Sequence, residues 1–137
     1  MREILFLLFF LLVACTDRAP SEAIVLPEDQ LPSIIRDANT GDLISIKRLI
    51  AHYAISPENR AAAEEWRAKA RSLGDPDELY YHAAELFIEA KREHIAVKRR
   101  ILLTTALKSA RHSYESDRDK ATLRLIDEIL VAIDAMQ

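Results

Sequence analysis

The sequence predicts an all-α fold of about five to six helices, and three observations support this. From Leu31 onward the chain is rich in Ala, Leu, Ile, Glu, Lys and Arg, which are strong helix formers. Only two glycines and three prolines interrupt this stretch, and they lie where helices should start or stop. No segment alternates apolar and polar residues as a half-buried strand would. The chain is therefore expected to form a short right-handed array of antiparallel helical hairpins.

The first three helices are predicted from their stop and start signals. A short helix over residues 31–40 ends at a glycine, and Asp42 then caps a second helix whose apolar residues recur at helical spacing as far as Tyr53. Ser56 is expected to cap the third helix, with a proline at its first position and an acid in its first turn. This helix should end near Leu73, just before the second glycine.

The last three helices follow the same logic. Asp75 and the proline after it begin a helix that runs to about residue 92, and a longer helix covers about residues 95–114. Ser116 and Asp117 are expected to cap the final helix, which is apolar on more than one side. Two interpretations of that helix stay open: the preceding long helix covers it, or one of its faces is free for a partner.

The N-terminus predicts where the protein is located. Residues 4–13 form an apolar run of about the length of a signal-peptide core, and they are too short to span a bilayer. The run ends in Leu12-Val13-Ala14-Cys15, which contains the only cysteine of the chain. These four residues resemble the lipobox of bacterial lipoproteins, in which the cysteine is acylated after the signal peptide is removed. The resemblance implies a membrane-anchored lipoprotein, carrying fatty acids such as palmitate, at the outer membrane and facing the periplasm.

The domain organisation follows from this anchor. Residues 1–14 are expected to be the signal peptide, and residues 15–30 the lipidated cysteine with a proline-containing tether. Residues 31–137 then form a single helical-repeat domain with one core. An uncleaved short anchor, or cleavage elsewhere with a free thiol, are the alternatives for the N-terminus.

An internal repeat is present in the helical region. The dipeptide Gly-Asp at residues 41–42 recurs at residues 74–75, a spacing close to the roughly 34 residues of helix-turn-helix repeats. Between these points, one set of residues resembles the signature of a Sel-one-like repeat, a relative of the tetratricopeptide repeat (TPR): Gly41, Leu49, Tyr53, Ala63, Trp66, Lys69, Ala70 and Gly74. The resemblance implies a helical scaffold that binds other proteins. In it, Tyr53 and Trp66 would be the large side chains that set how one hairpin stacks on the next.

The chain shows no arrangement typical of an enzyme, a metal site or a cofactor site. The four histidines are predicted on four different helices without a close ligand pair, at positions His52, His82, His94 and His112. Glu85 and Glu89 share a helix face, but two solvated carboxylates explain them better than a hydrolytic pair. With two glycines in all, no phosphate-binding loop can be formed. We therefore expect a non-enzymatic protein without catalytic residues, metal or cofactor.

Charge is distributed unevenly along the chain. Residues 16–90 contain fourteen acidic and eight basic side chains, whereas residues 91–137 contain ten basic and seven acidic ones. The basic set could form a stripe that meets anionic lipid headgroups or an acidic partner, and its leading members are Lys91, Arg92, Lys98, Arg99 and Arg100. An ordinary solvated helix face is the alternative interpretation. Nucleic acid is not expected as a partner of an exported, acidic protein.

Two functions remain open from the sequence. The first is a protein-interaction module at the periplasmic side of the membrane, because small Sel-one-like lipoproteins resemble immunity proteins that neutralise toxins such as phospholipases delivered into that compartment. An acidic or concave helical face around Asp42, Glu64, Glu65 and Glu78 would then bind the toxin and block the access of its substrate. The second is a scaffold lipoprotein that maintains the cell envelope.

Overall fold

A computed structural model describes residues 25–136, and within these residues it contains six α-helices and no strand. The predicted all-α class is thus confirmed. The predicted signal peptide, the predicted lipidation site at Cys15 and residues 16–24 lie outside the described residues. The helices are α1 (Leu31–Asn39), α2 (Leu43–Ala54), α3 (Arg60–Ser72), α4 (Pro76–Arg92), α5 (Ala96–Ser116) and α6 (Lys120–Asp134), with a 3-10 turn at Pro57–Asn59 before α3.

The two Gly-Asp dipeptides form the same turn in two places. Gly41 and Gly74 both have positive φ angles, +97° and +80°, and in both turns the aspartate amide donates to a carbonyl five residues earlier. This is the hydrogen-bonding pattern of a glycine C-cap, in which the left-handed residue stops the helix. The aspartate then caps the next helix, because Asp42 accepts from the Ser45 amide at 2.8 Å and Asp75 from the Glu78 amide at 3.0 Å. The sequence signal for these two junctions is therefore confirmed.

The starts of α3 and α6 differ from the prediction. Ser56 makes no capping hydrogen bond with its side chain, because its hydroxyl bonds instead to Glu58, which lowers the pKa of that carboxyl. The last helix is capped by Asp119, which accepts from the amides of residues 121 and 122, and Ser116 is still the final residue of α5. Because α5 continues as far as Ser116, the cap of α6 is the next aspartate in the chain, Asp119, and not the predicted Ser116 and Asp117.

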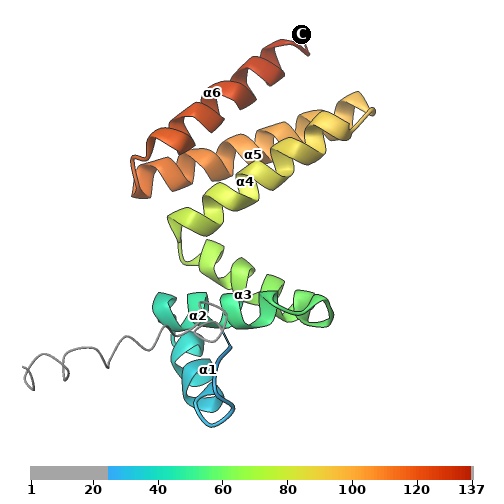
Figure 1. The fold of residues 1–137 in the computed structure, drawn as a ribbon. Helices are drawn as coiled ribbons and strands as arrows, with labels where there is room; N and C mark the ends of the chain where they lie inside the picture. Colours follow the sequence, from blue (N-terminus) through green and yellow to red (C-terminus); the bar gives the residue numbers. More distant parts are fainter. Residues whose placement is uncertain (1–24, 137) are drawn as a thin grey trace, which may run out of the picture.

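The buried residues form two clusters rather than one core. The first cluster lies among α1, α2 and α3: Leu26, Ile34, Ala38, Ile46, Leu49, Ile50 and Ala70. The second lies among α4, α5 and α6: Ala83, Phe87, Ala90, Leu103, Ala106, Ala110, Leu125, Ile126 and Ile129. Figure 1 shows the corresponding shape, with α1–α3 forming a lower group and α4–α6 an upper group joined at the α3–α4 turn. We call these groups the first half and the second half.

The halves are joined by polar contacts around the start of α4. Lys47 on α2 contacts Asp75 at 2.9 Å and Asp77 at 2.7 Å, and hydrogen bonds to both raise the pKa of Lys47 although burial opposes this. Asp75 is only 2% exposed, so one oxygen caps α4 while the other binds the lysine. The Ser113 hydroxyl on α5 donates to the Pro76 carbonyl at 2.8 Å. The start of α4 is thereby held from both sides.

The end of the predicted tether is packed against the first half. Leu26 is buried in the first cluster, and its amide donates to the Nδ1 atom of His52 at 3.1 Å. The prediction that the tether extends to residue 30 is therefore wrong from Leu26 onward. Leu26 was not recognised from the sequence as part of the core because it lies next to a proline and outside any helix.

The final helix satisfies both earlier interpretations in part. Leu125, Ile126 and Ile129 are buried against α5 and α4, whereas Leu123 and Val131 remain exposed. Figure 1 shows α6 diverging from α5 toward the C-terminal end.

Candidate functional site: a charged groove between the two halves

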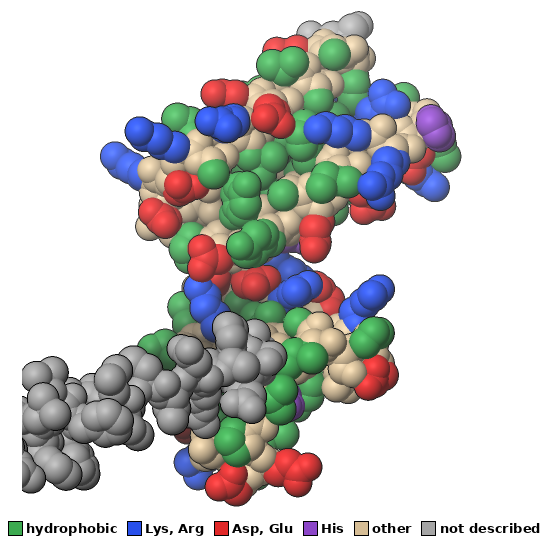
Figure 2. Space-filling model, viewed as in Figure 1, with side chains coloured by type: hydrophobic (Ala, Val, Ile, Leu, Met, Phe, Trp, Pro, Cys, Tyr) green, Lys and Arg blue, Asp and Glu red, His purple; other side chains and the backbone are tan. Residues whose placement is uncertain are grey.

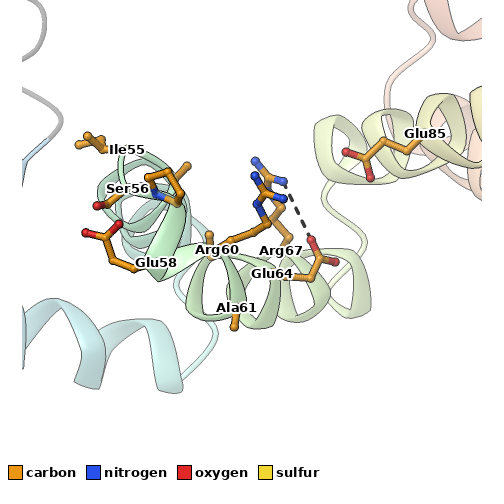
Figure 3. A pocket seen from close by; sticks show the side chains of 11 residues that line it. Ile55, Ser56, Glu58, Arg60, Ala61, Glu64, Arg67 and Glu85 are labelled. Carbon is orange, nitrogen blue, oxygen red and sulfur yellow. Dashed lines mark ion pairs between the residues drawn. The ribbon is translucent and has the colours of Figure 1, made fainter.

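An open groove of about 830 Å³ lies where the α2–α3 connection, α3 and α4 face one another. Figure 3 shows Ile55, Ser56, Glu58 and Arg60 along one side, with Glu85 of α4 across from them. Ala61 and Ala63 line the groove, and Ala63 is buried. Their side chains are small and therefore fill little of the groove. The groove exists because α3 and α4 meet mainly at their shared turn and diverge beyond it.

A second hollow of about 380 Å³ continues this surface along α3 and α4. It shares Arg67 and Glu85 with the first, and it adds Tyr81, His82 and Ile88 from α4. Figure 2 shows the corresponding narrowing between the two halves, with acidic and basic side chains on both sides of it. We call the two hollows together the groove.

Ion pairs hold the charged side chains of the groove in place. Arg71 donates to Glu64 at 2.6 Å, and Arg67 lies 4.0 Å from both Glu64 and Glu78. These four residues connect α3 with α4, because Glu78 is on α4 and the other three are on α3. The groove therefore carries both charges, with one close ion pair within α3 and longer contacts from Arg67 to Glu64 and Glu78.

Two groups in the groove have shifted proton affinities. Burial raises the pKa of Glu78, with opposition from the charges of Arg67 and Arg71. Burial, assisted by the positive charge of Arg71, lowers the pKa of His82. Both shifts disfavour the charged form, as expected for groups removed from water. The groove therefore presents a neutral imidazole beside fixed arginines at neutral pH, an environment suited to contacting polar groups of a partner.

The predicted repeat signature builds the first half rather than a binding site. Leu49 and Ala70 are fully buried, and Tyr53 and Trp66 pack against the first cluster, which also contains Ile34 and Ala38 of α1. Lys69 bonds to the Asn39 carbonyl at 3.1 Å while its Nζ lies 5.5 Å from the centre of the Trp66 ring. These side chains hold α3 against α1 and α2.

The structure brings together two of the four residues of the predicted acidic face. Glu64 and Glu78 meet in the groove through Arg67, whereas Glu65 is exposed on α3 and does not line either hollow. Asp42 caps α2, and its hydrogen bonds to Ser45 lower the pKa of its carboxyl. A purely acidic face is thus replaced by a groove of mixed charge.

Of the five residues of the predicted basic stripe, Arg99 is engaged with the backbone and the other four are exposed. Arg99 turns back and donates through Nε and Nη2 to the Glu93 carbonyl, at 2.9 and 2.8 Å. Lys91 lies 4.1 Å from the centre of the Phe87 ring, while its neighbours Arg92, Lys98 and Arg100 are exposed. Arg99 therefore closes the α4–α5 turn and leaves the other four charges at the end of the hairpin.

The histidines do not gather. His52 and His82 lie in different halves, His112 approaches Gly74, and His94 lies in the α4–α5 turn rather than on a helix as predicted. Within residues 25–136, no three His, Cys, Asp or Glu side chains come together in the way a metal site needs.

The three arginines of the groove on α3 were not singled out from the sequence, although their spacing with Glu64 is a signal for them. Arg60, Glu64, Arg67 and Arg71 follow one another at steps of four, three and four, which places them on one face of α3. Only their partners across the groove depend on how α3 and α4 diverge.

Comparisons with known proteins found no relative of the chain. No family model, curated protein or solved structure matches the chain. Among the helices described, none combines the length and the apolar character that crossing a bilayer requires.

Proposed function

We propose that the chain is a membrane-anchored protein-interaction module that faces the periplasm and binds a protein partner in the groove. The observation that carries this proposal is the set of paired charges that α3 and α4 present in the groove, beside exposed apolar side chains such as Tyr81 and Ile88. Charged side chains held in one geometry lose little entropy on binding, and neighbouring apolar surface adds affinity.

The partner that fits best under this proposal is a toxin delivered into the periplasm, which the bound protein would neutralise. Support comes from the Sel-one-like signature, from the lipobox at Cys15, and from a groove large enough to hold a protruding loop or helix end. A tethered inhibitor benefits from a high effective concentration in the thin layer where the toxin arrives. A scaffold lipoprotein of the envelope is the second candidate, and it would use the same groove for a resident protein.

Cross-linking in cells tests the groove directly. Arg60 and Glu85 line opposite sides and take part in no ion pair among the described contacts, so exchanging their charges should preserve the fold. We expect the wild-type chain to cross-link to one partner in a one-to-one complex, and Arg60→Glu/Glu85→Arg to lose at least about tenfold of that product. The matched control is Arg124→Glu/Glu128→Arg, an equivalent exchange between exposed positions of α6. Equal loss in both variants would refute the groove as the binding surface.

A deletion strain distinguishes the two partner classes. If the partner is a toxin, deletion sensitises cells to neighbours that carry the toxin gene, and the groove variant fails to restore resistance. If deletion instead weakens the envelope in pure culture and changes no competition, the scaffold function holds and the immunity function is wrong.

A further inference from the structure

The end of the α4–α5 hairpin carries exposed apolar and basic residues together. Ile95, Val97 and Ile101 are 52%, 71% and 59% exposed, although isoleucine and valine are usually buried. Between residues 91 and 111 the chain contains seven Lys or Arg residues and one Glu. Figure 2 shows this combination at the upper right end of the molecule, where basic side chains surround hydrophobic ones.

The two kinds of side chain are arranged in stripes on α5. Val97 and Ile101 are four residues apart and share one face of the helix, and Lys108 continues the same face. At about 100° per residue, Arg100 lies on one side of this stripe and Lys98 on the other. The apolar stripe is therefore flanked by positive charge on both sides.

The hairpin end is held in a fixed shape by its own contacts. Arg99 donates twice to the Glu93 carbonyl, and the Glu93 side chain accepts from the Ile95 amide at 2.8 Å. The one acidic side chain of the turn is thus engaged with the backbone. These contacts leave the flanking Lys98 and Arg100 side chains exposed and outside any ion pair among the described contacts.

We propose that this hairpin end inserts shallowly into the surface of an anionic lipid bilayer, as a second membrane contact beside the predicted lipid anchor. Apolar side chains would enter the boundary between headgroups and acyl chains, while the flanking cations bind lipid phosphates. Charge complementarity favours an anionic bilayer as the occupant, because the patch combines exposed cations with exposed apolar side chains on neighbouring turns of one helix. The long stems of Lys and Arg suit this position, because the stem lies along apolar surface while the charge stays in the headgroup layer.

The contact would set the orientation of the molecule. A helix of 21 residues is about 30 Å long, so the hairpin end lies well away from the α3–α4 turn that borders the groove. A chain held at its N-terminus and at this end would lie along the membrane. The inference depends on the predicted anchor only for keeping the chain at the bilayer, and it is independent of which protein binds in the groove.

A single-tryptophan reporter tests the contact in the full chain. Trp66 is the only tryptophan, so Ile101→Trp in a Trp66→Phe background reports on the hairpin end alone, and Val97→Trp provides a second reporter. The chain is reconstituted with vesicles of phosphatidylcholine, with or without phosphatidylglycerol, containing brominated lipids that quench tryptophan. We expect quenching at least twofold greater with the anionic lipid, and loss of that difference in high salt. Leu123→Trp, near the opposite end of the hairpin, should show no such difference.

Charge variants test whether the cations of the hairpin end, rather than the overall electrostatic attraction of the chain to the vesicle, cause the membrane contact. Each Lys or Arg near an anionic surface favours the membrane-bound state by roughly fivefold. Lys98→Glu/Arg100→Glu should therefore shift the equilibrium between the membrane-inserted and the water-exposed hairpin end toward the exposed state by at least about 25-fold. Arg118→Glu/Lys120→Glu makes the same charge change at the far end and should leave quenching at position 101 unchanged. Vesicle-associated chain with water-exposed reporters at 97 and 101 would overturn this contact alone, whereas a chain that does not associate with any vesicle would overturn the anchor as well. The proposal would also be wrong if the reporters at positions 97 and 101 became shielded from water only when a protein was added, and not with anionic lipid.

Discussion

The two halves begin with the same turn but are stabilised in different ways. The first half has short helices, and its cluster is completed by Leu26 from outside any helix. The second half pairs the two longest helices, α4 and α5, and its cluster comes entirely from helices. The last helix of the first half, α3, fully buries only Ala63 and Ala70, although its Trp66 packs against the first cluster.

This difference explains where the groove lies. A helix that buries only alanines can present its remaining faces to solvent, and α3 uses one of them for the stripe that contains Arg67 and Arg71. Binding surfaces commonly lie on elements with few buried contacts, because such elements can carry side chains that do not serve the core. The stable hairpin of the second half then supplies the opposite wall through Glu78 and Glu85.

Cavity mutations in each cluster should separate the halves most strongly. Leu49 and Leu103 are both almost completely buried, one in each cluster, and replacing either with Ala should lower the free energy of unfolding by about 2–5 kcal/mol. Trp66 lies in the first half, so its emission reports on that half while ellipticity reports on both. We expect Leu103→Ala to lose ellipticity before Trp66 emission changes in a urea titration, and Leu49→Ala to change the emission first.

The exposed position Ile44 provides the control for this experiment. It is 72% exposed on α2, so Ile44→Ala should change the free energy of unfolding by less than about 0.5 kcal/mol. Coincident emission and ellipticity curves in both core variants would show that the halves unfold as one cooperative unit, contrary to the comparison made above.

The contact between the halves should give the next largest effect. Asp75→Ala removes the cap of α4 and leaves Lys47 without its buried partner, and together these should cost about 2–3 kcal/mol. Asp77→Ala removes only an exposed contact to the same lysine and should cost less than about 1 kcal/mol. Urea denaturation of the single variants and of Lys47→Ala/Asp75→Ala measures the coupling, which we expect to be less than additive. Additive losses would show that the ion pair contributes nothing to holding the halves together.

The glycine turns should respond equally in both halves. Gly74→Ala places a side chain at a φ of +80°, which costs about 1–2 kcal/mol, but the nearest atom to its Cβ would be His112 Nε2 at an ordinary 3.7 Å. Gly41→Ala faces the same backbone cost, with Leu73 Cδ2 at 3.8 Å. Thermal unfolding should therefore show similar losses for the two variants and a smaller loss for Gly74→Asn, because asparagine tolerates this conformation. A much larger loss at one glycine would reveal a steric constraint that the structure does not contain.

The features that the sequence predicted depend on residues close together in the chain, whereas those that it missed depend on contacts between residues far apart in the chain. Helix class, the glycine stops and the caps at Asp42 and Asp75 depend on neighbouring residues, and the sequence predicted them correctly. The cap at Asp119 was missed because α5 continues through Ser116, and that continuation places Ser113 against Pro76 at the start of α4. Local signals cannot reveal such a contact over 37 residues.

The candidate site shows the same limit. The spacing of Arg60, Glu64, Arg67 and Arg71 on one helix face was available from the sequence. Their position across from Glu85 depends on the angle between α3 and α4, which the start of α4 determines through its contacts with both halves. Of the four acids predicted to share a face, Glu64 and Glu78 both lie near Arg67 in the groove, whereas Asp42 caps α2 and Glu65 lines neither hollow.

The smallest expected effect comes from Glu78, where the halves face each other across buried charge. The folded-state pKa of Glu78 is raised chiefly by burial, so above that pKa the ionised carboxylate is less favourable in the folded than in the unfolded chain. Glu78→Gln should therefore slightly stabilise the protein at pH 7. The gain should shrink as the pH falls through the pKa of Glu78 in the folded chain, and vanish below the ordinary value of about 4.5, where both states are protonated. Thermal unfolding at pH 7 and pH 4, with Glu65→Gln as the control for losing one exposed negative charge, measures this difference. A loss of stability at pH 7 would mean that Arg67 and the start of α4 attract the carboxylate more strongly than burial disfavours it, and that the groove is held together by its charges rather than merely lined by them.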